Sequence, residues 1–266
     1  YIATAYKLEV GHPPGAPFFQ LFGRIFTLFA NQGTSEVALA INAMSAMCSS
    51  FTILFLFWTI TAFGRKLFLN NKENHDLGKI IAVLGSGIVG ALAYIFSDSF
   101  WFSAVEGEVY AMSSLFTPVT YWCILKWEEE SDKPHASRWL VLIGYLIGLS
   151  IGVHLLSLLT IPAMGMIYYF KKYNYSKAGA IKAFIASMIT LGLVQGVILP
   201  GAVSLISKFE LFFVNPVGLP FNSGTIIYFF AIIGAITYGI IYTKKHNKPI
   251  WNTMILGVMM LLIGYS

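Results

Sequence analysis

Long apolar runs alternate with short polar segments along most of the chain. A helix that crosses a bilayer needs roughly 20 mostly apolar residues. Eight runs approach or meet this length, and they predict membrane-spanning helices at about 36–64, 79–97, 107–127, 138–155, 157–171, 182–206, 223–243 and 250 to the end. The run at 157–171 is short and closely follows its predecessor, which favours a tight re-entrant pair around His154.

The first 35 residues have a different pattern. Residues 14–30 repeat apolar positions at helical spacing, but polar residues and a glycine interrupt them, which favours a helix lying in the membrane interface. Gly11 to Pro17 contains three prolines. Proline lacks a backbone donor and fixes its φ angle, so this segment is predicted to be shaped and non-helical. We therefore expect one transmembrane domain, with an outer loop and interfacial helix over 1–35 and a helical bundle over 36–266.

Composition supports an all-α polytopic membrane protein. Of the 266 residues, 57% are hydrophobic and 11% are charged, whereas soluble domains carry about 25% charge. Cys48 and Cys123 lie inside apolar runs, where we expect small hydrophobic side chains and no disulfide. The chain starts at Tyr1 in a polar segment and stops at Ser266 inside an apolar run, so we expect a fragment truncated at both ends.

Loop charge predicts the orientation. Fourteen of the 17 Lys and Arg residues fall in the loops at 64–79, 126–138, 171–182 and 244–248. The positive-inside rule places these loops in the cytoplasm, and it places 1–35, 97–107 and 206–222 outside. The net charge of +5 is then explained by membrane topology, and nucleic-acid binding is not expected.

Acidic residues gather on the opposite, outer side. Six of the twelve acids lie there or at its boundary, whereas three basic residues do. The six acids are Glu9, Glu36, Asp98, Glu106, Glu108 and Glu210. Ionisable groups close to the bilayer are costly and usually mark function. Glu108 and Tyr110 fall at the start of an inward helix, where the helix dipole favours an anion. A carboxylate here suits a polar head group or a sugar hydroxyl. Alternatively, Glu106 or Glu108 caps the helix and Glu9 is a solvated loop acid.

Three further side chains could take part in a site. His154 lies in an apolar run, so its ring needs a polar partner. His12 sits beside Pro13 and Pro14, either in a site or as an ordinary interfacial histidine. Arg24 either snorkels to lipid phosphate or binds it within a site. The sequence has no metal-ligand spacing, phosphate loop, catalytic-triad order or nucleotide fingerprint. We expect no cofactor, and the spacing gives no support to a divalent metal on Glu9, His12 and His154.

Two segments resemble a known family. Tyr1 to Pro17 reads YIATAYKLEVGHPPGAP, and residues 100–116 read FWFSAVEGEVYAMSSLF. Both are similar to bacterial membrane proteins related to the eukaryotic transmembrane protein O-mannosyltransferase. More distantly, the chain resembles the GT-C superfamily of lipid-linked-sugar glycosyltransferases. The resemblance covers the whole chain in helix order, with the family's first transmembrane helix absent.

The resemblance implies a GT-C-like fold and a defined activity. Such an enzyme would move a mannose-like sugar from a polyprenyl-phosphate carrier to a protein Ser or Thr hydroxyl, with inversion, on the periplasmic face of a bacterial inner membrane. The family's principal acid would lie upstream of Tyr1, so the catalytic base is unknown and the fragment alone is expected to be inactive. Supporting acids would be Glu108, Glu106 and Glu9. The resemblance places His12, Pro13 and Pro14 in the loop beside that base. Arg24, Tyr110 and His154 are further substrate-binding candidates, chosen for their positions in the sequence.

The alternative is a non-enzymatic membrane protein, either a transporter or a subunit of a secretion or envelope assembly. Transporters often break helices and place charges near the bilayer midplane. In this chain the acids gather at one face, and His154 is the deep polar residue. That asymmetry favours chemistry at the membrane surface.

Overall fold

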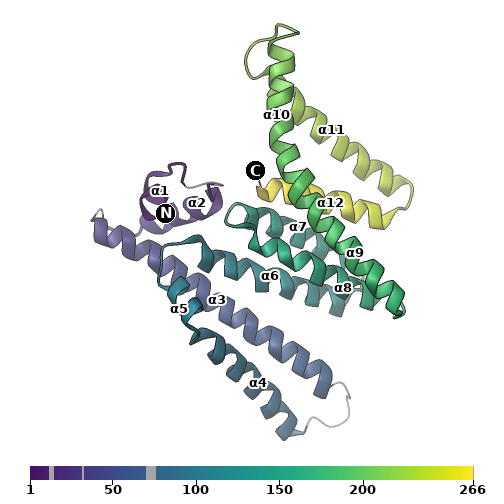
Figure 1. The fold of residues 1–266 in the computed structure, drawn as a ribbon. Coiled ribbons are helices and arrows are strands. Elements are labelled where there is room, and N and C mark those ends of the chain that lie inside the picture. The colour runs from purple at the N-terminus through teal and green to yellow at the C-terminus, as the bar shows by residue number, and fades with distance from the viewer. Residues whose placement is uncertain (12–14, 32, 70–75, 266) are drawn as a thin grey trace.

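The computed structural model describes residues 1–11, 15–31, 33–69 and 76–265, and within these ranges the regular structure is helical (Figure 1). The α-helices are α1 (Ile2–Lys7), α2 (Pro17–Thr27), α3 (Thr34–Phe68), α4 (Leu77–Ile95), α5 (Asp98–Ala104), α6 (Val109–Glu130), α7 (Ser137–Ile151), α8 (Thr160–Lys172), α9 (Lys177–Leu193), α10 (Leu199–Val214), α11 (Ser223–Lys245) and α12 (Pro249–Tyr265). The prediction of an all-α polytopic membrane protein is confirmed.

Four described helices are long and apolar enough to cross a membrane: α3, α4, the continuous helix Lys177–Val214 and α11. The continuous helix joins α9 and α10 through a π-helical turn at Val194–Ile198. The helices α7 and α12 are apolar but shorter. The other two predicted spans are also helical, as α6 and α8, and a 3₁₀ turn over Leu155–Leu159 connects α7 to α8.

The interfacial helix predicted over 14–30 is α2, shorter than expected at both ends. One face of α2 is buried against α1 and α3 through Phe19 and Gly23, while Leu21 and Ile25 remain 53% and 43% exposed on the other face. A β-carbon at Gly23 would lie 3.0 Å from the β-carbon of Ala5, so glycine lets α1 approach closely. An amphipathic helix with one exposed apolar face suits the membrane interface.

The charges predicted to share the cytoplasmic side come together at one end of the bundle. Arg65 and Lys126 contact Glu129 at 2.7 and 2.8 Å, and Arg138 contacts Glu130 at 3.0 Å. Lys172 contacts Asp132 at 3.3 Å. These ion pairs join the ends of α3, α6 and α8, which agrees with the prediction that these ends face the same side.

Cys48 and Cys123 are both buried and unpaired, as the sequence predicts. They belong to two separate apolar clusters. One cluster holds α1 and α2 against α3 and α6, and the other joins α6 to α7, α8, the 177–214 helix and α12. Because α6 belongs to both clusters, it fixes the N-terminal helices relative to the rest of the bundle.

Candidate functional site

Four side chains from separated segments lie at the end of the bundle opposite the ion pairs: Tyr1, Glu108, Tyr110 and His154. We call them the outer cluster. Tyr1 precedes α1, Glu108 and Tyr110 begin α6, and His154 follows α7. Tyr1 interacts electrostatically with both Glu108 and Tyr110. The rings of Tyr110 and His154 lie 5.6 Å apart.

Glu108 is the N-cap residue of α6, but its side chain makes no capping hydrogen bond. Its backbone N–H donates to the Glu106 carbonyl at 2.8 Å, so the loop is closed by main chain. Burial, and then the Glu108 carboxylate and Tyr110, raise the pKa of the Tyr1 phenol. Tyr1 is therefore a stable hydroxyl donor near a carboxylate that is not used as a cap. This geometry does not support the alternative in which Glu108 only caps the helix.

Gly107 allows the acidic loop to pack tightly on α3. A β-carbon at this position would lie 2.8 Å from Ile2 Cγ1 and 3.1 Å from Asn42 Oδ1. That Asn42 oxygen is buried and has no hydrogen-bond partner among the described residues. Buried polar atoms normally have a partner, so Asn42 adds an available acceptor beneath the loop that carries Glu108.

The turn after α7 attaches α2 to the cluster. The Gly152 carbonyl accepts hydrogen bonds from the backbone N–H groups of Phe18 at 2.8 Å and Phe19 at 3.4 Å. A β-carbon at Gly152 would lie 2.9 Å from Phe18 Cβ, so a side chain would push α2 away. In the same turn, His154 Nδ1 accepts a hydrogen bond from the Leu156 N–H at 3.2 Å. The imidazole is thus oriented by main chain and by the Tyr110 ring.

The other residues singled out from the sequence have local contacts of their own. Glu9 pairs with Lys7 at 3.8 Å and its side chain is 58% exposed, as in the solvated alternative. The Arg24 guanidinium lies 4.9 Å from the centre of the Tyr6 ring, and it donates to Thr27 Oγ1 at 3.4 Å. No hydrogen bond, ion pair or ring contact between described residues joins Glu9 or Arg24 to the outer cluster. His12, Pro13 and Pro14 lie outside the described residues.

Sequence reasoning missed Tyr1, Asn42 and Gly152. Asn42 carried a usable signal, since it is an amide inside an otherwise apolar run. Tyr1 and Gly152 carried none, because their roles depend on contacts with residues far away in the chain.

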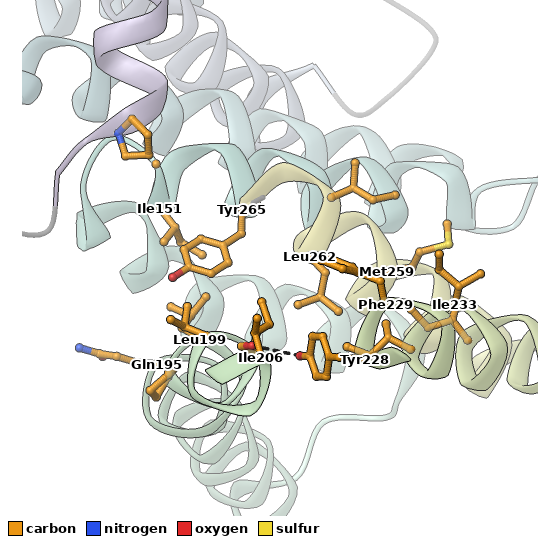
Figure 2. A pocket seen from close by; sticks show the side chains of 18 of the residues that line it. Ile151, Gln195, Leu199, Ile206, Tyr228, Phe229, Ile233, Met259, Leu262 and Tyr265 are labelled. Atoms are coloured by element: carbon orange, nitrogen blue, oxygen red, sulfur yellow. Dashed lines mark hydrogen bonds between the residues drawn. The ribbon is translucent and has the colours of Figure 1, made fainter. Parts of the chain in front are cut away.

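An apolar cavity of about 960 Å³ begins at the turn that carries His154. This volume is near the upper end of the ~300–1,000 Å³ typical of ligand pockets. Pro17, Ile151, Gly152 and Leu155 contribute to its lining, and the rest of the lining comes from the 177–214 helix, α11 and α12. Figure 2 shows Ile151 and Tyr265 towards one end and Ile233 and Met259 towards the other. We call this cavity the groove.

The polar atoms around the groove are few. The Tyr228 hydroxyl donates to the Ala202 carbonyl at 3.0 Å, which ties α11 to α10. Gln195 and Thr237 also belong to the lining, and Gln195 lies in the π-helical turn. An elongated apolar ligand is therefore a better fit than a polar one.

Over the part of the chain that the structure describes, metal-binding side chains do not gather. Among the described residues, no group of three or more His, Cys, Asp or Glu is placed to hold a metal ion. Glu9 and His154, two of the three side chains considered for a divalent metal, make no contact with each other.

The comparisons with known proteins identify the chain's relatives. The family model described as the protein O-mannosyl-transferase TMEM260 N-terminal domain matches residues 1–177. A protein of Dictyostelium discoideum named protein O-mannosyl-transferase tmem260 is 30% identical over 115 residues, which cover 43% of this chain and 12% of that protein. The Mus musculus protein O-mannosyl-transferase TMEM260 is 24% identical over 151 residues, covering 56% of this chain and 19% of that protein.

No solved structure matches the chain. The alignments span less than a fifth of either curated relative. The family match nevertheless covers more than half of this chain, including every member of the outer cluster. The chain therefore belongs to the family of the protein O-mannosyl-transferase TMEM260 N-terminal domain.

Proposed function

We propose that this chain forms part of a membrane glycosyltransferase that moves a mannose-like sugar from a polyprenyl-phosphate carrier to a protein Ser or Thr hydroxyl. The observation that carries the proposal is the outer cluster. Its Glu108 carboxylate makes no capping hydrogen bond, and the cluster lies beside the end of an apolar groove. Membership of a family whose curated relatives are named protein O-mannosyl-transferases supports the same reaction.

The proposed reaction is an inverting displacement. The acceptor hydroxyl loses its proton to a carboxylate base as its oxygen bonds to the anomeric carbon. The bond between that carbon and the phosphate oxygen breaks, and the phosphate leaves with the electron pair. We assign Glu108 and Tyr1 to hydrogen bonding with sugar or acceptor hydroxyls, and we do not assign the base to this chain. Holding both substrates in line is a large part of such catalysis.

The groove supports a lipid-linked donor. Its lining is apolar, it lies among helices of spanning length, and Gly152 and Leu155 bring one end to the outer cluster. A polyprenyl chain in the groove would place its phosphate and sugar near Tyr110 and His154. A donor of this kind brings its own leaving group and anchor, so no nucleotide-binding fold is needed.

The outer cluster is proposed to face the periplasm of a bacterial inner membrane. Support comes from loop charge, because the Lys- and Arg-rich segments end at the opposite side of the bundle, in the ion pairs of α3, α6 and α8. The positive-inside rule assigns that basic side to the cytoplasm.

Sugar transfer by the full-length protein tests the proposal. Membranes that contain it are expected to transfer labelled mannose from polyprenyl-phosphate mannose to a Ser/Thr-containing acceptor protein, whereas membranes without it are not. Solute flux in proteoliposomes without any sugar transfer would contradict the proposal and favour a transporter.

A further inference from the structure

We propose that His154 binds the phosphate of the lipid-linked donor through its Nε2–H group and so positions the donor's head. This inference rests on the function proposed above and names the residue that holds the leaving group. It makes His154 a positioning residue, distinct from the carboxylate chemistry of Glu108.

The hydrogen bond at Nδ1 determines which nitrogen can donate. His154 Nδ1 accepts from the Leu156 N–H at 3.2 Å. In a neutral imidazole one nitrogen accepts and the other carries the proton. The proton of neutral His154 is therefore on Nε2. Nε2 has no protein partner among the described residues, so this N–H can reach a ligand.

His154 lies between an apolar region and a polar region of the protein. Gly152 and Leu155, on either side of it in the chain, line the groove. The imidazole itself packs against Tyr110, which is two residues beyond Glu108. An amphiphile with its chain in the groove would have its head group beside this ring.

The arrangement of charged residues also leaves a neutral hydrogen-bond donor to bind the phosphate at this end of the groove. No Lys or Arg is present in the groove lining. Lys7 is paired with Glu9, Arg24 lies over the Tyr6 ring, and Lys208 is exposed on α10 outside the groove lining. A phosphate at the end of the groove would therefore depend on N–H and O–H donors, and His154 presents one where the groove ends. A hydrogen bond to a charged group at such a site corresponds to roughly 10- to 100-fold in affinity.

Two substitutions of His154 distinguish the roles of its two imidazole nitrogen atoms. His154→Asn keeps an acceptor close to the position of Nδ1, and Asn caps this kind of turn well, but it has no atom at the position of Nε2. His154→Gln keeps an N–H donor near Nε2 and loses the acceptor for Leu156. His246→Asn is the matched control, because His246 ends α11 and packs on Tyr242 with ring centroids 4.3 Å apart.

The test measures binding of undecaprenyl phosphate and of uncharged undecaprenol to the full-length protein in nanodiscs. His154→Asn is expected to lower affinity for the phosphate about 10- to 100-fold while leaving affinity for the alcohol unchanged. His154→Gln should keep most of the phosphate preference, and His246→Asn should keep all of it. An unchanged phosphate preference in His154→Asn would overturn the proposal.

If His154→Asn does not fold, His154→Gln carries the test. A folded His154→Gln that binds both lipids equally would also overturn the assignment of Nε2. Failure of the proposed function gives a different result, namely intact phosphate preference in the wild type without sugar transfer.

Discussion

Glu108→Gln is expected to slow sugar transfer about 10- to 100-fold in the full-length protein, because a hydrogen bond to a charged group contributes about 1.5–3 kcal/mol. The amide keeps the shape of the side chain but loses the negative charge. Glu108 makes no capping bond through its side chain. The substitution should therefore leave the start of α6 and the thermal stability of the protein nearly unchanged. Transfer from polyprenyl-phosphate mannose to an acceptor peptide, followed over time, measures the effect.

Glu36→Gln is the matched control for Glu108. Glu36 is also an acid predicted to lie on the outer side, but it is exposed. Its Oε1 accepts a hydrogen bond at 3.5 Å from Nδ2 of Asn31, which lies in the loop before α3. We expect this variant to transfer sugar at the wild-type rate. Equal rates for Glu108→Gln and Glu36→Gln, with both proteins folded, would remove Glu108 from the site.

Gly148→Ala is expected to destabilise the protein by about 1–3 kcal/mol, the range typical of an overpacked interface. The helices α7 and α12 touch main chain to main chain at this point. A β-carbon at Gly148 would lie 2.2 Å from the Leu261 carbonyl oxygen, and one at Gly144 would lie 2.5 Å from that of Gly257. Because backbone atoms cannot rotate away as a flexible side chain can, α12 must shift. Thermal unfolding in detergent measures the loss.

Gly257→Ala provides the comparison on the facing helix. A β-carbon added at Gly257 meets nothing within 4 Å, so this variant should unfold at nearly the wild-type temperature. Small residues at the contact are the usual way in which membrane helices approach closely. Since Leu262 and Tyr265 of α12 line the groove, Gly148→Ala should also weaken binding of polyprenyl phosphate. Equal unfolding temperatures for the two variants would contradict this account of the interface.

The helices could be predicted because apolar length is a local property of the sequence. The main difference lies in the span predicted at 182–206, which is part of a helix that runs over Lys177–Val214. The helix continues from α9 into α10 through the π-helical turn at Val194–Ile198, just before Pro200, and it ends beyond the predicted span. The loop charges alone placed Arg65 and Arg138 on the same side, and the structure adds that both pair with carboxylates of α6.

The candidate site could be predicted only in part. Glu108 and Tyr110 stood out because they begin an inward helix next to an acidic outer segment, and His154 stood out because it is a polar side chain inside an apolar run. The juxtaposition of His154 with Tyr110 depends on the way α6 and α7 pack, which no local pattern encodes. The groove is a still less local feature, since its lining extends from Pro17 to Tyr265.

Photocrosslinking tests most directly the claim that one lipid-linked donor occupies both the groove and the outer cluster. The probe is polyprenyl-phosphate mannose with a diazirine in its isoprenoid chain, added to membranes that contain the full-length protein. Saturable labelling is expected in the peptides of α10, α11 and α12 that line the groove, and unlabelled polyprenyl phosphate should compete with it. Labelling restricted to the basic end of the bundle, around Lys133 and Lys172, or labelling without competition, would contradict the account.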